Sequence, residues 1–263
     1  MNQSHISEKF LKLVEIMANL RSEQGCPWDR EQTHETLVKY LIEESYEVSE
    51  SIAENNDDAL VEELGDVLLQ VVFHAQIAKE ENRFDIGDVL TKICDKMIGR
   101  HPHVFSDACA ESAEDVLRRW ESDKQKEKED RESILDGIPK QLPALMRAQR
   151  MQDRAAWVGF DWERFEEVLE KFEEEWREFR EACEQRDSKQ IQGELGDLFF
   201  ALVNTARLLK IDAEQCLTQT SDKFQSRFAY IERQLKARGH DIHKSTLAEM
   251  DSLWEESKKL DLR

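Results

Sequence analysis

Two stretches of the sequence carry closely spaced carboxylates on predicted helices. Each stretch places a Glu-Glu-x-x-Glu pattern ahead of a Glu-x-x-Asp pattern, and residues three or four positions apart share one face of an α-helix. The first set contains Glu43, Glu44, Glu47, Glu63 and Asp66, and the second contains Glu174, Glu175, Glu178, Glu194 and Asp197. Two antiparallel helices joined by a short turn would direct the carboxylates of each set toward one another.

Such a set is suited to holding a divalent cation. Glu44 falls within the apolar stripe of Leu37, Leu41 and Val48. Carboxylates on the packing side of a helix repel one another unless a positive charge neutralises them. The alternative is a glutamate-rich face that is simply solvated, which is common in a chain with 57 acidic residues.

The ligand types favour one class of metal. Oxygen-only sets suit Mg²⁺, with Mn²⁺ as a substitute. A di-iron carboxylate bundle needs Glu-x-x-His on two helices. The third residue after Glu63 is Asp66, and the third residue after Glu194 is Asp197. The sequence therefore predicts a magnesium site rather than an iron site.

The two sets are related by an internal repeat. Each carboxylate of the first set has its counterpart 131 positions later. A third block, Asp95-Lys96-x-x-x-Arg100, recurs 127 positions later as Asp222-Lys223-x-x-x-Arg227. One helical unit has been duplicated.

Residues after the second carboxylate set offer contacts for a nucleotide. Lys223 and Arg227 are four positions apart on one helix and could pair with phosphate oxygens, although the spacing is also typical of a solvated face. Trp254 could stack on a base or anchor a hydrophobic core.

The composition predicts an all-α protein. Glycine (9) and proline (4) are scarce, so the chain has few turns, while 40% hydrophobic and 36% charged residues suit amphipathic helices. We expect helices at 5–20, 33–54, 57–81, 86–100, 144–155, 164–186, 188–210, 213–238 and 245–259, with N-caps at Thr33, Asp57 and Ser188. Gly65 and Gly196, in mid-helix, indicate that a partner helix or a ligand approaches the backbone closely.

The repeat and the charged stretch between its copies predict two tandem helical bundles. We expect an N-terminal domain at 1–118, a charged linker at 119–140 and a C-terminal domain at 141–263.

Net charge and cysteine content limit the partners and the location. A formal charge of −20 disfavours binding to nucleic acid or to an anionic membrane surface, and no apolar run reaches the length of a membrane span. Five cysteines without a C-x-x-C spacing argue against a disulfide framework and for a cytoplasmic protein.

Several motifs together resemble a known family. The sequence contains GCPWD at 25–29, EESYE at 43–47, ELGDVLLQVVFHAQ at 63–76, RHPHVF at 100–105, LPALMRAQ at 142–149, VGFDW at 158–162 and ELGDLFFALVN at 194–204. In this order and twice over, they resemble the two-domain bacterial type of the MazG family of nucleoside triphosphate pyrophosphohydrolases. The resemblance implies two tandem MazG-like all-α domains, a homodimer and Mg²⁺-dependent cleavage between the α and β phosphates. It also implies a broad range of ribo- and deoxyribonucleotides and a role in clearing unwanted nucleotides that is linked to nutritional stress.

The resemblance also assigns roles to residues of the C-terminal copy. It implies metal ligands at Glu175, Glu178, Glu194 and Asp197, and nucleotide contacts at Lys171, Glu174, Gln190, Lys223, Arg227 and Trp254. At Gln190 the family pattern tends to have a lysine.

The N-terminal copy keeps a second set of ligands but a poorer nucleotide pocket. This set comprises Glu44, Glu47, Glu63 and Asp66. Tyr40 takes the place of Lys171, and no tryptophan corresponds to Trp254. We therefore expect the C-terminal copy to be the main catalytic site. Two alternatives are a narrow-specificity pyrophosphatase acting on dUTP or another single nucleotide, and a non-catalytic helical regulatory or interaction protein.

Overall fold

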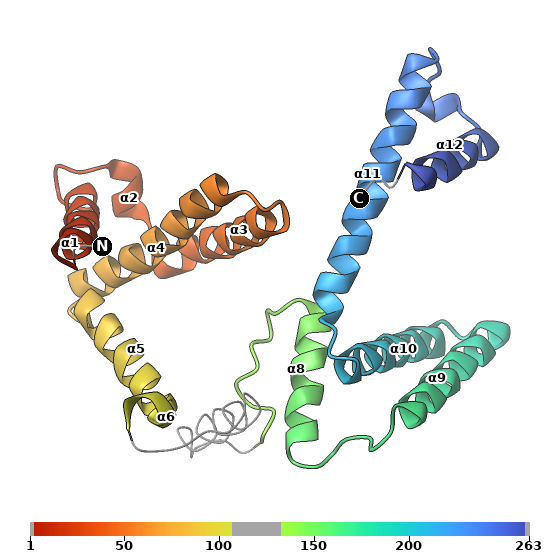
Figure 1. The fold of residues 1–263 in the computed structure, drawn as a ribbon, viewed down its shortest axis with the longest axis horizontal. Coiled ribbons are helices and arrows are strands. Elements are labelled where there is room, and N and C mark those ends of the chain that lie inside the picture. The colour runs from red at the N-terminus through yellow and green to blue at the C-terminus, as the bar shows by residue number, and fades with distance from the viewer. Residues whose placement is uncertain (1–2, 107–132, 261–263) are drawn as a thin grey trace. The chain divides into compact units, whose positions relative to one another are not determined.

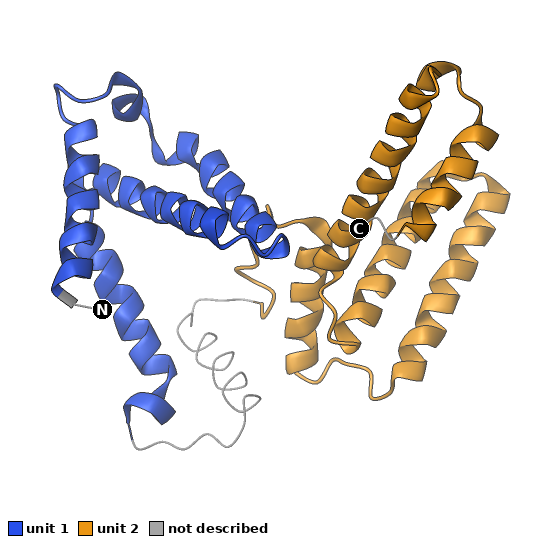
Figure 2. Cartoon of the chain, turned by 45° about the horizontal axis from the view of Figure 1, so that its top comes forward, with its two compact units in different colours: residues 1–127 blue, residues 128–263 orange. Residues whose placement is uncertain are grey.

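The computed structural model describes residues 3–106 and 133–260, and every regular element in these ranges is a helix (Figure 1). The predicted all-α fold is confirmed. The chain divides into two compact units, unit 1 at residues 1–127 and unit 2 at residues 128–263 (Figure 2). Most of the predicted linker, 119–140, lies outside the described residues. None of the described helices is long and apolar enough to cross a lipid bilayer.

Unit 1 contains the first carboxylate set. Its helices are α1 (Gln3–Leu20), α2 (Pro27–Glu31), α3 (His34–Ala53), α4 (Asp57–Glu80), α5 (Ile86–Arg100) and α6 (Pro102–Phe105). The two short helices, α2 and α6, were not expected from the sequence. Each begins with a proline at its first helical position, where proline is favoured, and each is too short to show a helical period.

The core of unit 1 joins α1, α3 and α4. Met17, Leu37, Val72, Phe73 and Ile77 are at most 3% exposed and form one cluster. Each such side chain contributes about 1.5–3 kcal/mol when it leaves water. This packing holds α3 against α4, the two helices that carry the first carboxylate set.

Unit 2 contains the second carboxylate set. Its elements are α8 (Ala144–Trp157), α9 (Phe165–Gln185), α10 (Ser188–Leu208), α11 (Ala213–Ala237), the 3₁₀ turn η1 (Ile242–Lys244) and α12 (Leu247–Lys259). Figure 1 shows α9 and α10 side by side, with α11 and α12 paired at a distance from α9. Tyr230, Ile231, Leu235 and Leu253 form the core between α11 and α12.

One of the three predicted N-caps is confirmed and two are wrong by one residue. Thr33 accepts a hydrogen bond from the Thr36 N–H and caps α3. Asn56, rather than Asp57, caps α4, and Asp187, rather than Ser188, caps α10. In both cases the residue before the predicted one has the extended backbone that an N-cap needs, and its side-chain oxygen reaches the first amides of the helix.

Candidate active site

The second carboxylate set converges between α9 and α10. One oxygen from each of Glu175, Glu194 and Asp197 lies within 4.8 Å of the other two. Arg186, with a φ of 58°, ends α9 in a left-handed conformation and lets α10 return beside it. Glu175 is only 7% exposed, and a buried carboxylate facing two others requires a nearby positive charge.

Lys171 supplies a positive charge at the edge of this cluster. Its Nζ lies 2.7 Å from a carboxylate oxygen of Glu175 and 3.2 Å from one of Glu174. The hydrogen bond to Glu175 is the largest cause of a raised pKa for Lys171, so the lysine stays charged. Lys171 lies one turn before Glu175 on α9, and Glu174 is the residue directly before Glu175.

Glu178 lies beside the converging group. It is not among the three residues whose oxygens converge, but its charge acts on Glu194. Burial is the largest cause of the raised pKa of Glu194, followed by the charges of Glu178, Asp197 and Glu175. The structure therefore brings three of the four predicted ligands together and places the fourth at their periphery.

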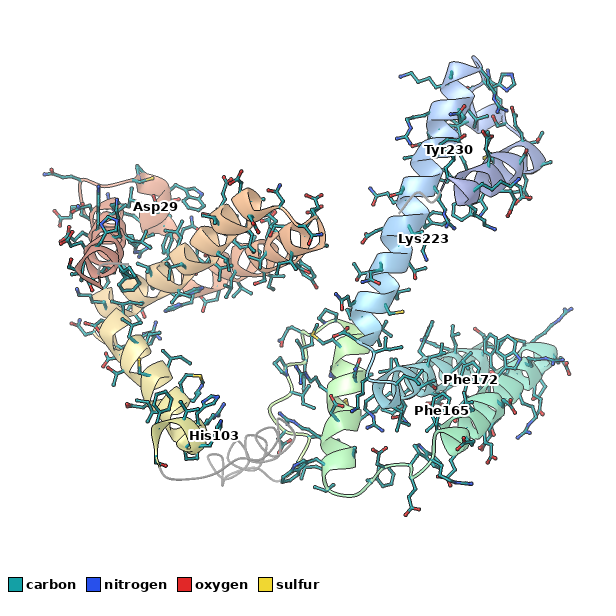
Figure 3. All side chains as sticks on the ribbon, in the orientation of Figure 1. Asp29, His103, Phe165, Phe172, Lys223 and Tyr230 are labelled. Carbon is teal, nitrogen blue, oxygen red and sulfur yellow. The ribbon has the colours of Figure 1, made fainter. Side chains whose placement is uncertain are left out.

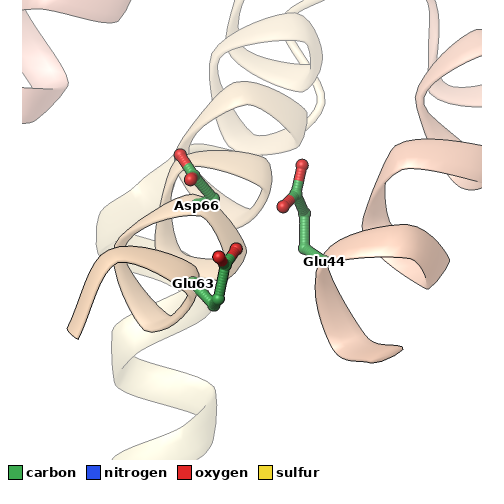
Figure 4. Close-up of side chains that lie close together, drawn as sticks. All are labelled: Glu44, Glu63 and Asp66. Atoms are coloured by element: carbon green, nitrogen blue, oxygen red, sulfur yellow. The ribbon is translucent and has the colours of Figure 1, made fainter. Parts of the chain in front are cut away.

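The first carboxylate set has the same arrangement between α3 and α4. Oxygens of Glu44, Glu63 and Asp66 lie within 4.8 Å of one another (Figure 4). The pKa of Glu44 is raised to about 7, first by burial, then by a hydrogen bond with Glu47 and by the charges of Asp66, Glu47 and Glu63. Glu47 is not among the three converging residues but interacts with Glu44, just as Glu178 is outside the second group and acts on Glu194.

Both groups fit a hard divalent cation. Among the described residues, these are the two sets of three or more His, Cys, Asp or Glu side chains that could share a metal ion. All the donors are carboxylate oxygens, which suits Mg²⁺ or Mn²⁺ rather than a metal that prefers nitrogen or sulfur. The raised pKa values of Glu44 and Glu194 reflect burial first and repulsion from the neighbouring carboxylates second, and a bound cation would counteract both effects.

Three other predicted nucleotide contacts, Lys223, Arg227 and Trp254, lie on α11 and α12 rather than on the helices that carry the carboxylates. The guanidinium of Arg227 lies 5.7 Å from the ring centre of Trp254, and the ring of Phe224 lies 5.3 Å from it. Figure 3 shows Lys223 on α11, well separated from Phe172, the neighbour of Lys171 on α9.

Gln190 lies in the first turn of α10 and is exposed. Its backbone N–H donates to the capping carboxylate of Asp187. The side chain lies one turn before Glu194, as the sequence predicted.

Comparison with known proteins decides the family. The MazG nucleotide pyrophosphohydrolase domain matches residues 32–105 and 163–230. The nucleoside triphosphate pyrophosphohydrolase of Escherichia coli (strain K12) is 46% identical over 256 residues, which cover 95% of this chain and 97% of that protein. The nucleoside triphosphate pyrophosphohydrolase/pyrophosphatase MazG of Thermotoga maritima is 46% identical over 250 residues, 95% of each chain. This chain belongs to the MazG family.

Both MazG segments contain a complete carboxylate set. The first runs from the start of α3 to the end of α6, and the second from α9 into α11. Helix α8 and Trp254 lie outside the matched segments. The duplication inferred from the sequence is thus a duplication of the MazG domain.

The MazG segment of unit 2 also borders a cavity that the sequence analysis missed. The cavity has a volume of about 410 Å³ and lies between α8, α9 and α10. Lys171, Glu175 and Asp197 line it together with Gln152 and Asn204. A signal was present in the repeat, because Asn204 and Ala201 occupy the positions that match Phe73 and Gln70 in the first copy. The side chains of the first copy at these two positions are larger than those of the second copy. This difference indicates that there is space beside the second carboxylate group.

Proposed function

We propose that this protein is a Mg²⁺-dependent nucleoside triphosphate pyrophosphohydrolase. It hydrolyses ribo- and deoxyribonucleoside triphosphates between the α and β phosphates and releases the monophosphate and pyrophosphate. The observation that carries the proposal is the converging group of Glu175, Glu194 and Asp197, with Lys171 beside it, inside a MazG segment. The names of the relatives in E. coli and T. maritima support the reaction class.

The second carboxylate set would hold the cation through Glu175, Glu178, Glu194 and Asp197. A bound Mg²⁺ supplies charge neutralisation at the phosphate oxygens. Glu175 or Glu178 accepts the proton of the water that attacks the α-phosphorus. Lys171 donates hydrogen bonds to the phosphate chain, and charge-assisted bonds of this kind are among the strongest that a side chain makes.

We assign the main activity to unit 2. Lys171 lies 2.7 Å from Glu175 in this unit, whereas the matching position in unit 1 is Tyr40. A triphosphate approaching unit 1 meets clustered carboxylates without that lysine. Unit 1 therefore binds a cation with weaker or no turnover.

A homodimer would complete the molecule. Helices α9 and α10 expose large apolar side chains, among them Trp176 (47%), Phe199 (52%) and Leu202 (46%). A Cβ added at Gly196 would meet no atom of another described element within 4 Å, so no other helix in the described part of the chain approaches this glycine, and its face is open to a second copy. A second copy seated on this face would bury the apolar side chains.

The dimer also accounts for Lys223 and Arg227. Both lie on α11, apart from the carboxylates of their own chain (Figure 3). Their predicted contacts with phosphate oxygens follow if each α11 faces the carboxylate group of the other copy.

Product analysis tests the proposed reaction. The eight common ribo- and deoxyribonucleoside triphosphates are incubated with the protein and Mg²⁺, and the products are separated by anion exchange. We expect monophosphate and pyrophosphate from most of them, activity with Mn²⁺ in place of Mg²⁺, and none with a chelator. Release of diphosphate and orthophosphate would contradict the proposal. Turnover of dUTP alone would replace it with the narrow-specificity alternative.

A further inference from the structure

Two histidines join α3 to α4 in unit 1. His34 is the first residue of α3, and His74 lies in the last third of α4. Their Nδ1 atoms are 2.7 Å apart, and their ring planes are 3° from parallel with the ring centres 5.0 Å apart. The two nitrogens are closer than the about 3.5 Å of a van der Waals contact. They therefore share a hydrogen bond.

The partners of these rings determine which nitrogen of each carries the proton. Arg83, in the turn between α4 and α5, contacts Nε2 of His34 through its Nη2. A guanidinium group can only donate, so His34 Nε2 accepts and the proton of this ring is on Nδ1. His34 Nδ1 then donates to His74 Nδ1, and His74 carries its own proton on Nε2. Both rings are neutral in this arrangement.

An additional proton on either ring breaks one of the two contacts. On His34 the proton would be at Nε2, where it faces the charged guanidinium of Arg83. On His74 it would be at Nδ1, where it faces the N–H of His34. The place of His34 at the start of α3 acts in the same direction, because the N-terminus of a helix disfavours a positive charge.

Three carboxylates at this end of unit 1 have partners of their own. They are Glu81 with Arg83, Glu80 with Arg21, and Glu35 with the hydroxyl of Thr33. The hydrogen bond from Thr33 is the largest cause of the lowered pKa of Glu35. Glu35 and Glu81 favour a proton on His34, but each of them already has a partner while the histidines are neutral.

We propose that His34 and His74 form a pH-sensitive switch, which holds α3 against α4 while both rings are neutral and releases this contact when either ring takes up a proton. Burial, and after it the charge of His34, lowers the pKa of His74, as expected for a ring that is kept neutral. Leu37, one turn after His34, and Phe73, next to His74, belong to the core cluster of unit 1. Release of the contact therefore loosens the packing of unit 1.

The switch weakens unit 1 as the pH falls. A histidine with a lowered pKa binds fewer protons in the folded state than in the unfolded state. The contribution of His74 is therefore complete above its ordinary pKa of about 6.5 and is lost as the pH falls below that value. Glu44, ten residues after His34 on α3, has a raised pKa and acts in the opposite direction. The test consequently compares variants with wild type at each pH.

Nuclear magnetic resonance tests the proton positions in the wild-type protein. Long-range ¹H–¹⁵N spectra of histidine-labelled protein at about pH 8 should show a proton on Nδ1 of His34 and on Nε2 of His74. The signals are assigned by their loss in His34→Gln and His74→Asn. On acidification, His74 should titrate below about pH 6.5. A proton on Nε2 of His34, or titration of His74 at or above that pH, would overturn the inference.

Thermal melts at saturating Mg²⁺ test the effect on unit 1. His74→Asn keeps an acceptor near the place of Nδ1 but takes up no proton in this pH range. Between about pH 7.5 and 5.5, the Tm of unit 1 should fall by roughly 4 °C more in wild type than in this variant, because wild type loses a hydrogen bond. His5→Asn, at an exposed histidine of α1, should follow wild type.

A second variant covers the case in which His74→Asn does not fold. Arg83→Met removes an exposed side chain and lets Nε2 of His34 take up a proton without facing a guanidinium. The fall in Tm on acidification should therefore be smaller in Arg83→Met than in wild type. A fall as large as that of wild type in the folded variants, or a fall reduced equally by His5→Asn, would overturn the inference.

Discussion

The two MazG segments each bring three matching carboxylates within 4.8 Å of one another, but in different surroundings. In unit 2, Glu175 lies 2.7 Å from the ammonium group of Lys171. In unit 1, Glu44 shares its group with Glu63 and Asp66, and its pKa is raised to about 7. Duplication has kept the candidate cation ligands in both copies. One position next to them differs, because Lys171 of the second copy is matched by Tyr40 in the first.

The second difference between the units is space. Gln152, Asn204 and Ala201 border a cavity beside the carboxylates of unit 2. In unit 1 the position matching Asn204 is Phe73, which is part of the hydrophobic core. Unit 2 thus has a cavity beside its carboxylates, whereas in unit 1 the matching helix face packs into the hydrophobic core.

Exchanging the residue that distinguishes the two copies gives the largest effect. Lys171→Tyr should lower kcat/KM for ATP about 100-fold, because it removes charge-assisted hydrogen bonds to the phosphates. Steady-state kinetics check this, with circular dichroism to show that the helices persist. The control is Lys189→Tyr, on an exposed side chain near the start of α10. An equal loss in the control would mean that the charge of Lys171 has no special role.

Mixing two inactive variants tests whether the sites of unit 2 are shared between chains. Glu194→Ala and Arg227→Ala should each be nearly inactive alone. After denaturation and joint refolding, about a quarter of wild-type activity should return, because half of the dimers are mixed and each mixed dimer has one intact site. Failure to recover activity would place Arg227 at the site of its own chain or outside any site.

The raised pKa of Glu44 predicts that the stability of unit 1 depends on pH. A carboxyl whose pKa rises from 4.5 to about 7 on folding binds more protons in the folded state than in the unfolded state within that window. Without divalent cation, stability should therefore fall as the pH rises from about 5 to about 8. Thermal melts in a chelator should show a smaller fall for Glu44→Gln than for wild type.

A control variant and the addition of Mg²⁺ test whether the pH dependence comes from Glu44. Glu43→Gln, an exposed neighbour that removes the same charge, should melt with the pH dependence of wild type. Added Mg²⁺ should restore the stability lost at about pH 8, because the cation takes the place of the proton. Parallel curves for wild type and Glu44→Gln would contradict the raised pKa.

The matched helix caps provide the smallest effect. Asn56 and Asp187 lie 131 positions apart and cap α4 and α10. Alanine at either position should cost about 1 kcal/mol, which lowers the melting temperature of the affected unit by about 4 °C. Calorimetry measures both variants, and a drop in only one of them would show that the two units depend differently on these helices.

Much of the fold follows from the sequence because helical periodicity is a local property. All nine predicted helices are present in the structure, with ends within a few residues of those expected. The errors at Asp57 and Ser188 are of one residue, because the sequence does not show which backbone is extended. Helices α2 and α6 were missed because a single turn has no period to detect.

Only those residues of the candidate site that recur in the internal repeat could be predicted from the sequence. The carboxylates could be found because residues on one helix face recur at a fixed offset. Gln152 could not be found, since nothing in its local sequence distinguishes it from an ordinary residue of α8. It stands out only in the folded structure. There its Nε2 donates to the carbonyl of Phe200, 48 positions away, and its own Oε1 is buried without a partner. The separation of Lys223 and Arg227 from the carboxylates likewise depends on tertiary structure.

The most direct test compares matched ligands of the two units in one assay. Monophosphate and pyrophosphate formation from ATP is measured for wild type, Glu175→Ala and Glu44→Ala at saturating Mg²⁺. Glu175→Ala should lose activity on the order of 1,000-fold, because it removes a ligand of the cation on which the reaction depends. Glu44→Ala should stay within about threefold of wild type. If Glu44→Ala abolishes turnover while Glu175→Ala retains it, the catalytic site lies in unit 1 and the assignment made here is wrong.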